Sequence, residues 1–379
     1  MVFEGHQEGK TPVNENRLRV IDADGHVVEP VEMWEDYLEL GYRHRRPKLV
    51  EDSWGTPRIL MENMFFPKGR GYDCGNTDGW LVGSGTSRFR GGSDPHARIQ
   101  DMDADGPTDM AVLFPSLATQ AWAIRDPGFE AALCRAYNDW IADYAGAYPE
   151  RLKAVIVPPL NTVDAAIAEI RRCRNKSPVF VGIVIPSNIH GRNLQQPELY
   201  PLWQEAQELD LPVCTHISTG SNIPAAGGER FDNFFQTHCV TFPFEAMINV
   251  LDFVTGGVLE LHPHLRVAFM ESGIGWVPYW MDRLDEHYER RAHEVPLCKK
   301  PPSEYMKSNQ CYFSSDPDEK TIPMAVEHLG EDRILYASDY PHWDSRFPHT
   351  VHELLKQEMA STAKAKILGG NAMQLFKLA

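Results

Sequence analysis

Eight short apolar segments recur along the chain and alternate with helix-like segments, and this alternation limits the folds that the sequence can adopt. Apolar runs between turn signals are typical of strands that are buried on both faces. Strands that alternate with helical patterns predict parallel pairing through helical crossovers. The predicted strands cover residues 18–24, 110–114, 152–157, 180–185, 212–216, 266–270, 311–314 and 333–337.

A doubly wound sheet and a closed barrel both fit this alternation. A doubly wound sheet normally shows a glycine-rich fingerprint after its first strand, and no such fingerprint follows residues 18–24. Polar side chains instead end the first, fifth, sixth and eighth predicted strands. Because the carboxyl ends of barrel strands converge on one mouth, this pattern favours an α/β fold of the (β/α)8 TIM-barrel type.

One long stretch interrupts the alternation after the first strand. Residues 30–95 mix glycine pairs with aromatic side chains, and they are too long for an ordinary connection. We therefore expect an insertion with a functional or lid-like role. Residues 1–17 are predicted to be a polar N-terminal extension, and residues 18–379 are predicted to form a single barrel domain that includes this insertion.

Charge and composition narrow the classes of partner. The chain has 53 acidic and 37 basic residues and a formal net charge of -16, which disfavours nucleic acid and anionic membrane surfaces as partners. Its seven cysteines are dispersed without a CxxC pair, so neither a zinc ribbon nor a disulfide framework is indicated. The sequence shows no signal-peptide pattern and no spanning apolar run. We expect a cytoplasmic protein that acts on a small molecule.

Four side chains at predicted strand ends suggest a metal site. Asp24 and His26 are two residues apart, so they point the same way from an extended strand, although Asp-Gly is also a common turn pair. His216 ends the fifth strand and Asp339 follows the eighth. A strand-end His can equally be a hydrogen-bonded core group, and an Asp can cap a helix. Together, however, the four predict a divalent cation such as Zn, Mn or Fe.

Five motifs occur in a fixed order along the chain. They are VIDADGHVVEP at residues 20–30, CTH at 214–216, HPHLRV with ESGIGWVP at 262–278, YASDYP at 336–341 and ILGGNAMQLF at 367–376.

This ordered set resembles the amidohydrolase superfamily, in the amidohydrolase-related branch that contains aminocarboxymuconate-semialdehyde and resorcylate decarboxylases. The resemblance implies a (β/α)8 barrel that holds a divalent metal. It also implies ligand roles for Asp24, where the HxH version of the motif has His, and for His26, His216 and Asp339.

One position departs from the pattern of the decarboxylases. They carry a His at the end of strand six, where this chain has Glu271. A carboxylate beside a cation is a weak base at neutral pH, so Glu271 is better suited to binding a metal or bridging two. His238 and His342 are further candidate imidazoles, although His238 is equally compatible with a hydrogen bond at a helix start. The sequence therefore leaves one or two ions open.

Candidate substrate-binding residues are less specific. Arg70 and Arg88 in the insertion can bind a substrate carboxylate in a bidentate manner, but each is also compatible with a solvated surface Arg. Trp80 and Trp122 are candidates for the wall of a pocket, and His342 is a candidate polar contact to the substrate.

Three functions follow from this reasoning. The first is a metal-dependent hydrolase or decarboxylase-like lyase that acts on a small carboxylated or acyl substrate through a metal-activated water, with Asp339, Glu271 and His238 as catalytic residues. The second is a dinuclear Fe/Mn oxygenase with Glu271 and His238 as extra ligands. The third is a catalytically silent barrel subunit. By analogy with similar barrels, we expect a homo-oligomer or a hetero-oligomer with a related subunit.

Overall fold

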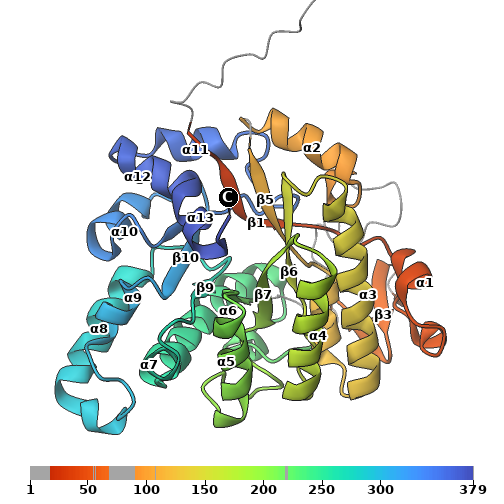
Figure 1. Cartoon of the computed structure of the whole chain (residues 1–379), viewed down its shortest axis with the longest axis horizontal. Helices are drawn as coiled ribbons and strands as arrows, with labels where there is room; N and C mark the ends of the chain where they lie inside the picture. Colours follow the sequence, from red (N-terminus) through yellow and green to blue (C-terminus); the bar gives the residue numbers. More distant parts are fainter. Residues whose placement is uncertain are drawn as a thin grey trace, which may run out of the picture.

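The chain folds around a barrel of eight parallel strands, as the alternation of strands and helices predicts (Figure 1). The structure is a computed structural model that describes residues 18–53, 55, 57–67, 90–106, 108–217 and 221–378. Neighbouring strands pair in the order β1-β5-β6-β7-β8-β9-β10-β11. Their bounds are β1 Ile21–His26, β5 Met110–Phe114, β6 Leu152–Ile156, β7 Phe180–Pro186, β8 Val213–His216, β9 Val267–Phe269, β10 Cys311–Ser315 and β11 Ile334–Tyr336.

Helices surround the strands and cover the outer face of the barrel (Figure 1). Their local signals are the expected ones: Asp126 and Thr162 cap the two longest helices of the first half by accepting hydrogen bonds from backbone amides of the first turn. The principal helices are α2 Pro95–Ala104, α3 Pro127–Gly146, α4 Val163–Lys176, α5 Tyr200–Glu208, α6 Phe234–Val250, α7 Val258–Leu261, α8 Val277–Arg291, α9 Pro302–Met306, α10 Ile322–Leu329, α11 Thr350–Lys356, α12 Ser361–Ala365 and α13 Asn371–Phe376.

The first and last strands meet through the segment that follows β11. Asp339 N donates to Asp24 O at 3.0 Å, and His26 N donates to Tyr340 O at 2.6 Å. Ser338 adds two hydrogen bonds to the Asp22 carboxylate, from its backbone N at 2.9 Å and from Oγ at 2.6 Å. These bonds close the barrel and bring the end of β1 and the segment after β11 together at its mouth.

A buried arginine contacts the end of β1 and the segment after β11. Arg98 of α2 is 1% exposed, and its guanidinium donates to His26 O at 2.7 Å and lies 3.8 Å from the Asp22 carboxylate. Its guanidinium carbon also lies 4.5 Å from the centre of the Tyr340 ring. Buried charges require such partners, and through these contacts Arg98 holds the end of β1 in place.

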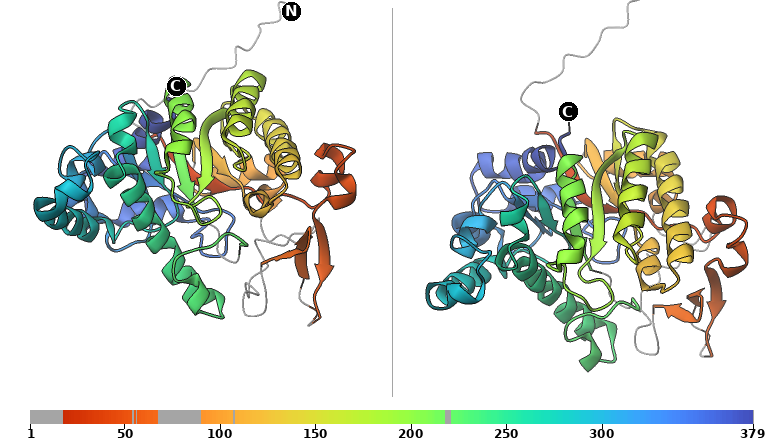
Figure 2. Two further views of the ribbon diagram at one scale, coloured as in Figure 1. Left: turned by 90° about the horizontal axis from the view of Figure 1, so that it is seen from below. Right: turned by 60° about the horizontal axis from the view of Figure 1, so that its bottom comes forward.

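The region of the predicted insertion holds a small separate sheet. It contains helix α1 Met33–Tyr37 and the antiparallel strands β2 Lys48–Glu51, β3 Pro57–Met61 and β4 Met64–Phe66. Figure 2 shows this sheet to one side of the barrel. Asn222 Nδ2 donates to Phe65 O at 3.0 Å and so links the sheet to the loop after β8.

Two of the differences from the predicted bounds bear on the mouth of the barrel. The sequence predicts a helix over 244–255 after a loop at 220–232, but α6 begins at Phe234, with Asn233 as its N-cap, and continues into a π-helical turn at Leu251–Thr255. Pro243 inside the helix explains the late predicted start, because proline usually marks a helix boundary. The first strand extends to His26 instead of ending at residue 24.

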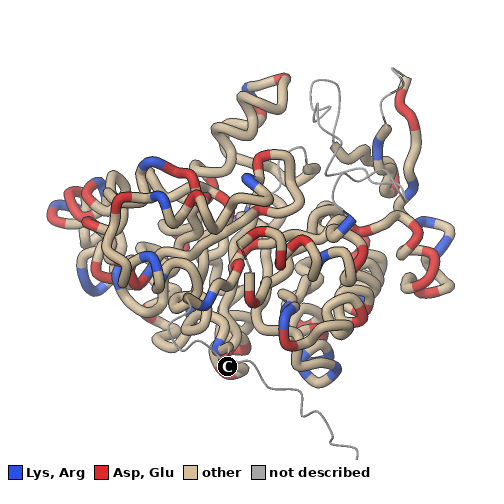
Figure 3. Tube along the Cα trace, turned by 90° about the horizontal axis from the view of Figure 1, so that it is seen from above, with Lys and Arg blue, Asp and Glu red and all other residues tan. Residues whose placement is uncertain are grey.

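Charged residues of both signs are distributed over the outer helices (Figure 3). Within the described part of the chain, no helix is both long enough and apolar enough to cross a membrane.

Candidate metal centre

The four side chains predicted as metal ligands converge at the mouth of the barrel. His26 Nε2 lies 3.5 Å from Asp24 Oδ1 and 3.4 Å from Asp339 Oδ1. His216 Nε2, from the end of β8, lies 3.6 Å from Asp24 Oδ1. Ligand atoms about 2.1 Å from one ion in a tetrahedral arrangement are separated by roughly 3.4 Å. These spacings fit cation ligands better than direct hydrogen bonds. Among the described residues the potential ligand atoms form two groups that share His26: one with Asp24 and His216, the other with Glu271, Asp339 and His342.

The polar atoms at the centre of this cluster have no hydrogen-bond partner within the described ranges. They are both carboxylate oxygens of Asp24, Nε2 of His26 and Nε2 of His216, and all are buried. Nearly all buried polar atoms in proteins are hydrogen-bonded, because an unpaired one costs a desolvation penalty. Unpartnered atoms that face one another across 3.5 to 3.6 Å are accounted for by a cation, which all of them can bind.

Hydrogen bonds behind two of the imidazoles set their ligand nitrogens. His26 Nδ1 lies 3.1 Å from Pro115 O, and His216 Nδ1 lies 2.8 Å from Ile217 O. A carbonyl can only accept, so each Nδ1 carries a proton, and each Nε2 presents its lone pair to the centre when the ring is neutral. This second layer of contacts is typical of metal-binding histidines.

Glu271 supplies a fifth donor atom. Its Oε2 lies 3.1 Å from His216 Nε2 and 3.7 Å from His26 Nε2. Glu271 and Asp339 both have positive φ, 45° and 52°, a left-handed conformation that costs non-glycine residues about 1 kcal/mol or more. In both residues this strained backbone directs a carboxylate into the mouth.

The other two candidate imidazoles behave differently. His342 lies beside the cluster, with Nδ1 2.7 Å from Asp339 Oδ1 and Nε2 3.0 Å from Ser116 Oγ, so both of its nitrogens are occupied. His238 packs on Phe242 with ring centres 4.3 Å apart and belongs to neither group of potential ligands among the described residues. The structure therefore does not place His238 at the centre, because α6 starts early and directs that residue into an aromatic cluster.

Burial and mutual repulsion shape the electrostatics of the site. Burial raises the pKa of Glu271 to about 7 although His216 opposes the shift, and burial with the charge of Glu271 raises the pKa of Asp339. Burial lowers the pKa of His26 and brings that of His342 to about 3. Burial opposes protonation of His216, but the charges of Asp24 and Glu271 raise the pKa of His216 to about 10. A divalent cation would take the place of that proton and bind the imidazoles and the Asp24 and Asp339 carboxylates in their deprotonated forms.

Of the candidate substrate-binding residues, Trp122 and His342 lie within the described part of the chain. Trp122 is buried, and its indole Nε1 donates to Pro158 O at 2.8 Å. It lines, with His216 and Ile223, a narrow cavity of about 10 Å³ beside the centre. Arg70, Arg88 and Trp80 lie outside the described residues.

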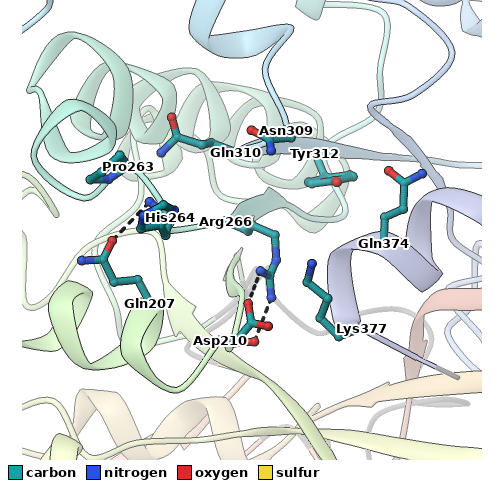
Figure 4. Close-up of a pocket in the computed structure, with 10 residues that line it drawn as sticks. All are labelled: Gln207, Asp210, Pro263, His264, Arg266, Asn309, Gln310, Tyr312, Gln374 and Lys377. Carbon is teal, nitrogen blue, oxygen red and sulfur yellow. Dashed lines mark hydrogen bonds and ion pairs between the residues drawn. The ribbon is translucent and has the colours of Figure 1, made fainter.

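A larger pocket lies at the opposite end of the barrel. It measures about 620 Å³, and Figure 4 shows its polar lining near the starts of β9 and β10, with Arg266 paired to Asp210. It contains none of the cluster residues, so the chemistry belongs to the narrow mouth and not to this larger pocket.

Sequence reasoning missed several residues that support this centre. Ser116, Arg98 and the carbonyl of Pro115 hold His342 or His26 in place. The only local signal was the Pro115-Ser116 pair at the end of a strand, which reads as an ordinary turn.

Comparison with known proteins agrees with this geometry. A 2-amino-3-carboxymuconate-6-semialdehyde decarboxylase from Dictyostelium discoideum is 27% identical over 287 residues, which cover 75% of this chain and 77% of the relative. An amidohydrolase structure from Mycobacterium avium subsp. paratuberculosis K-10 has a TM-score of 0.77 at 19% identity, covering 96% of this chain and 98% of that one.

A second solved structure and a family profile complete the comparison. A dihydroxybenzoic acid decarboxylase from Polaromonas sp. JS666, with bound manganese and 2-nitroresorcinol, has a TM-score of 0.66 at 20% identity, covering 96% of this chain and 98% of that one. The profile described as Amidohydrolase matches residues 21–378. This match over nearly the whole chain shows that the chain, whose barrel mouth carries the cluster of potential metal ligands, belongs to the amidohydrolase family.

Proposed function

We propose that this protein is a metal-dependent lyase that removes carbon dioxide from a small carboxylated substrate. The observation that carries the proposal is the set of buried, unpartnered atoms of Asp24, His26 and His216 that face one another at the barrel mouth. The decarboxylase names of two of the proteins compared support a lyase over a hydrolase. The manganese in one of them makes Mn a good first choice beside Zn.

Four residues would hold the ion in this proposal. Asp24, His26, His216 and Asp339 form the ligand set, and Glu271 lies beside it with its carboxyl group left for proton transfer. When bound, a divalent cation would polarise a substrate oxygen and stabilise negative charge that develops on it. We take a single ion close to His26, which both groups of potential ligands share. His238 lies outside both groups, and this lowers the support for a dinuclear oxygenase that uses it.

Glu271 is the candidate proton carrier. Loss of carbon dioxide leaves an electron pair on carbon that must receive a proton. The Glu271 side chain is 11% exposed, whereas that of Asp24 is 1% exposed, so Glu271 is the cluster carboxylate best placed to meet a substrate that enters the mouth. It replaces the imidazole found at this position in the decarboxylases that the sequence resembles.

That replacement also favours one alternative function. A carboxylate at the end of strand six can orient water, so hydrolysis or hydration by the same centre is the second candidate. The two candidates differ in their products, because only the lyase releases carbon dioxide without consuming water.

The test combines metal content with product analysis. Chain purified with Mn²⁺ and, separately, with Zn²⁺ should hold one ion per chain, and Asp24→Ala should lose it. We expect carbon dioxide from at least one acid in a panel of hydroxybenzoates that includes 2,6-dihydroxybenzoate. A loaded enzyme that hydrolyses esters or amides but decarboxylates no member of the panel would replace the lyase by the hydrolase.

A further inference from the structure

Three imidazoles lie at the mouth, and they differ in how their nitrogens are used. His26 and His216 each have one nitrogen on a backbone carbonyl and one without a partner within the described ranges. His342 has both nitrogens within hydrogen-bond distance of side chains and is 3% exposed. Its ring packs against that of His26, with centres 4.0 Å apart. A ring held this way is not available to a substrate, in contrast to the expectation from the sequence.

The contacts of His342 join three segments of the barrel mouth. Nδ1 donates to Asp339 Oδ1 at 2.7 Å in the turn after β11. Nε2 lies 3.0 Å from Ser116 Oγ, just after β5, and the ring rests on His26 at the end of β1. Ser116 Oγ also lies 2.7 Å from Val27 O. When Nδ1 holds the one proton of the neutral ring, the Ser116 hydroxyl donates its proton to Nε2. The imidazole therefore acts as a brace between Asp339 and a fixed point on the opposite side of the site.

Asp339 needs such a brace because its carboxyl group also faces that of Asp344, while its remaining contacts here fix the backbone. In addition to burial, the charge of Asp344 and its side-chain hydrogen bond raise the pKa of Asp339. Asp339 N donates to Asp24 O, and Asp339 O accepts from His342 N, at 3.0 and 2.8 Å. Its φ of 52° places it in a strained turn, and its carboxylate must point across the mouth toward His26 Nε2. The hydrogen bond from His342 selects that orientation of the carboxylate and holds Oδ1 3.4 Å from His26 Nε2.

We propose that His342 is a positioning residue that orients Asp339 for metal binding and is itself anchored by Ser116. This inference rests on the metal site of the proposed function, but not on the reaction. It assigns to His342 neither a bond to the ion nor a contact with substrate. The bond from Nδ1 and the anchor at Nε2 make separate contributions, and His342→Asn and Ser116→Ala can separate them.

The test measures the binding of Mn²⁺ alone, by the decrease in the electron paramagnetic resonance signal of the free ion. His342→Ala should raise the dissociation constant about 10- to 100-fold, the range for loss of a residue that orients a ligand. His342→Asn places an amide N–H near the position of Nδ1, so it should recover most of the affinity. Ser116→Ala should have a smaller effect than His342→Ala, and His293→Ala, at an exposed position, should have none.

The spectrum of the bound ion provides a second readout. Its line shape should broaden or split differently in His342→Ala and return toward wild type in His342→Asn, because the symmetry of the ligand set depends on the Asp339 carboxylate. Circular dichroism and thermal unfolding in EDTA show whether each variant is folded. A general loss of packing would weaken the Asn and Ala variants equally.

The outcomes separate this proposal from the proposed function. Wild-type affinity and spectrum in His342→Ala would overturn the positioning role, as would an Asn variant no better than Ala. A chain that binds Mn²⁺ with the expected pattern but releases no carbon dioxide would overturn the proposed lyase and leave the positioning role standing. A wild-type chain that binds neither Mn²⁺ nor Zn²⁺ would overturn both.

Discussion

Glu271 combines burial, backbone strain and ligand geometry in a single side chain. Its left-handed backbone conformation directs the carboxylate toward His216 Nε2 at 3.1 Å, while its amide donates to Ser314 Oγ at 2.8 Å. A strained backbone at a position where a charged side chain faces other ligands is characteristic of functional sites, because the rest of the fold must hold it there. Its neighbours Ser272 and Gly273 then lead the chain away from the mouth.

Glu271→Gln tests the chemical role of this carboxyl group. Gln keeps a ligand oxygen of similar reach but cannot carry the proton, so we expect metal content to remain and the rate of product formation to fall about 10²- to 10⁴-fold. The measurement is metal content by elemental analysis alongside initial rates on an active substrate of the panel. Glu289→Gln, at an exposed position on α8, is the matched control. A wild-type rate in Glu271→Gln would remove the residue from the reaction.

At the scale of elements, strand ends were predictable from sequence and supporting contacts were not. Asp24, His26, His216 and Asp339 stood out because polar residues that end apolar strands converge in a barrel. The role of Ser116 depends on His342, a contact across 226 residues that leaves no local pattern. His238 was misplaced for a related reason, because its position follows from where α6 begins. Periodicity identifies an element more reliably than its end points.

The π-helical turn Lys366–Gly370, within the last predicted motif, has a packing role of its own. It follows α12 and packs against the start of β1. A Cβ on Gly369 would collide with the backbone carbonyl oxygen of Arg19, whereas the nearest atom to a Cβ on Gly370 would be 3.6 Å away. A backbone atom cannot move aside as a flexible side chain can, so adjacent glycines differ in what they tolerate.

We therefore expect opposite effects from two neighbouring substitutions. Gly369→Ala should lower the free energy of unfolding by about 1–3 kcal/mol, the usual cost of overpacking. Gly370→Ala should leave it unchanged or raise it by up to about 1 kcal/mol, because alanine favours the helical backbone. Urea unfolding followed by circular dichroism measures both. Equal effects of the two substitutions would show that β1 and this turn are not packed as closely as the structure has them.

The molecule as a whole carries an acidic excess, and part of it is buried. Burial raises the pKa of Glu29 and of Asp252 to about 7, and that of Asp105 to about 6. None of these carboxyl groups belongs to the cluster at the mouth. All three shifts have the same sign. The self-repulsion of a chain whose net charge is -16 lowers stability in the same direction as the pH rises. Stability at neutral pH is therefore reduced, because these carboxyl groups ionise less easily in the folded chain than in the unfolded chain.

The sign of the resulting pH dependence follows from linkage. A carboxyl group whose pKa is higher in the folded state binds its proton more tightly there, so its stabilising effect is complete below the unfolded pKa of about 4. That effect is lost as the pH rises through the folded pKa. For Asp252 the loss falls between about pH 4 and pH 8. In EDTA, where no metal competes with protons for the cluster, we expect the free energy of unfolding to fall over this range.

Asp252→Asn isolates the contribution of one group to this decline. The carboxylate is 1% exposed and accepts a hydrogen bond from Leu194 N at 2.9 Å. An amide oxygen can still accept that bond while the side chain stays neutral at every pH. The variant should therefore resemble the wild type near pH 5 and exceed it by about 1–3 kcal/mol near pH 8. Urea titrations at both pH values measure the difference. Parallel pH profiles for the two proteins would show that Asp252 does not titrate in this range, and the decline would then have to come from the remaining buried carboxyl groups and the net charge.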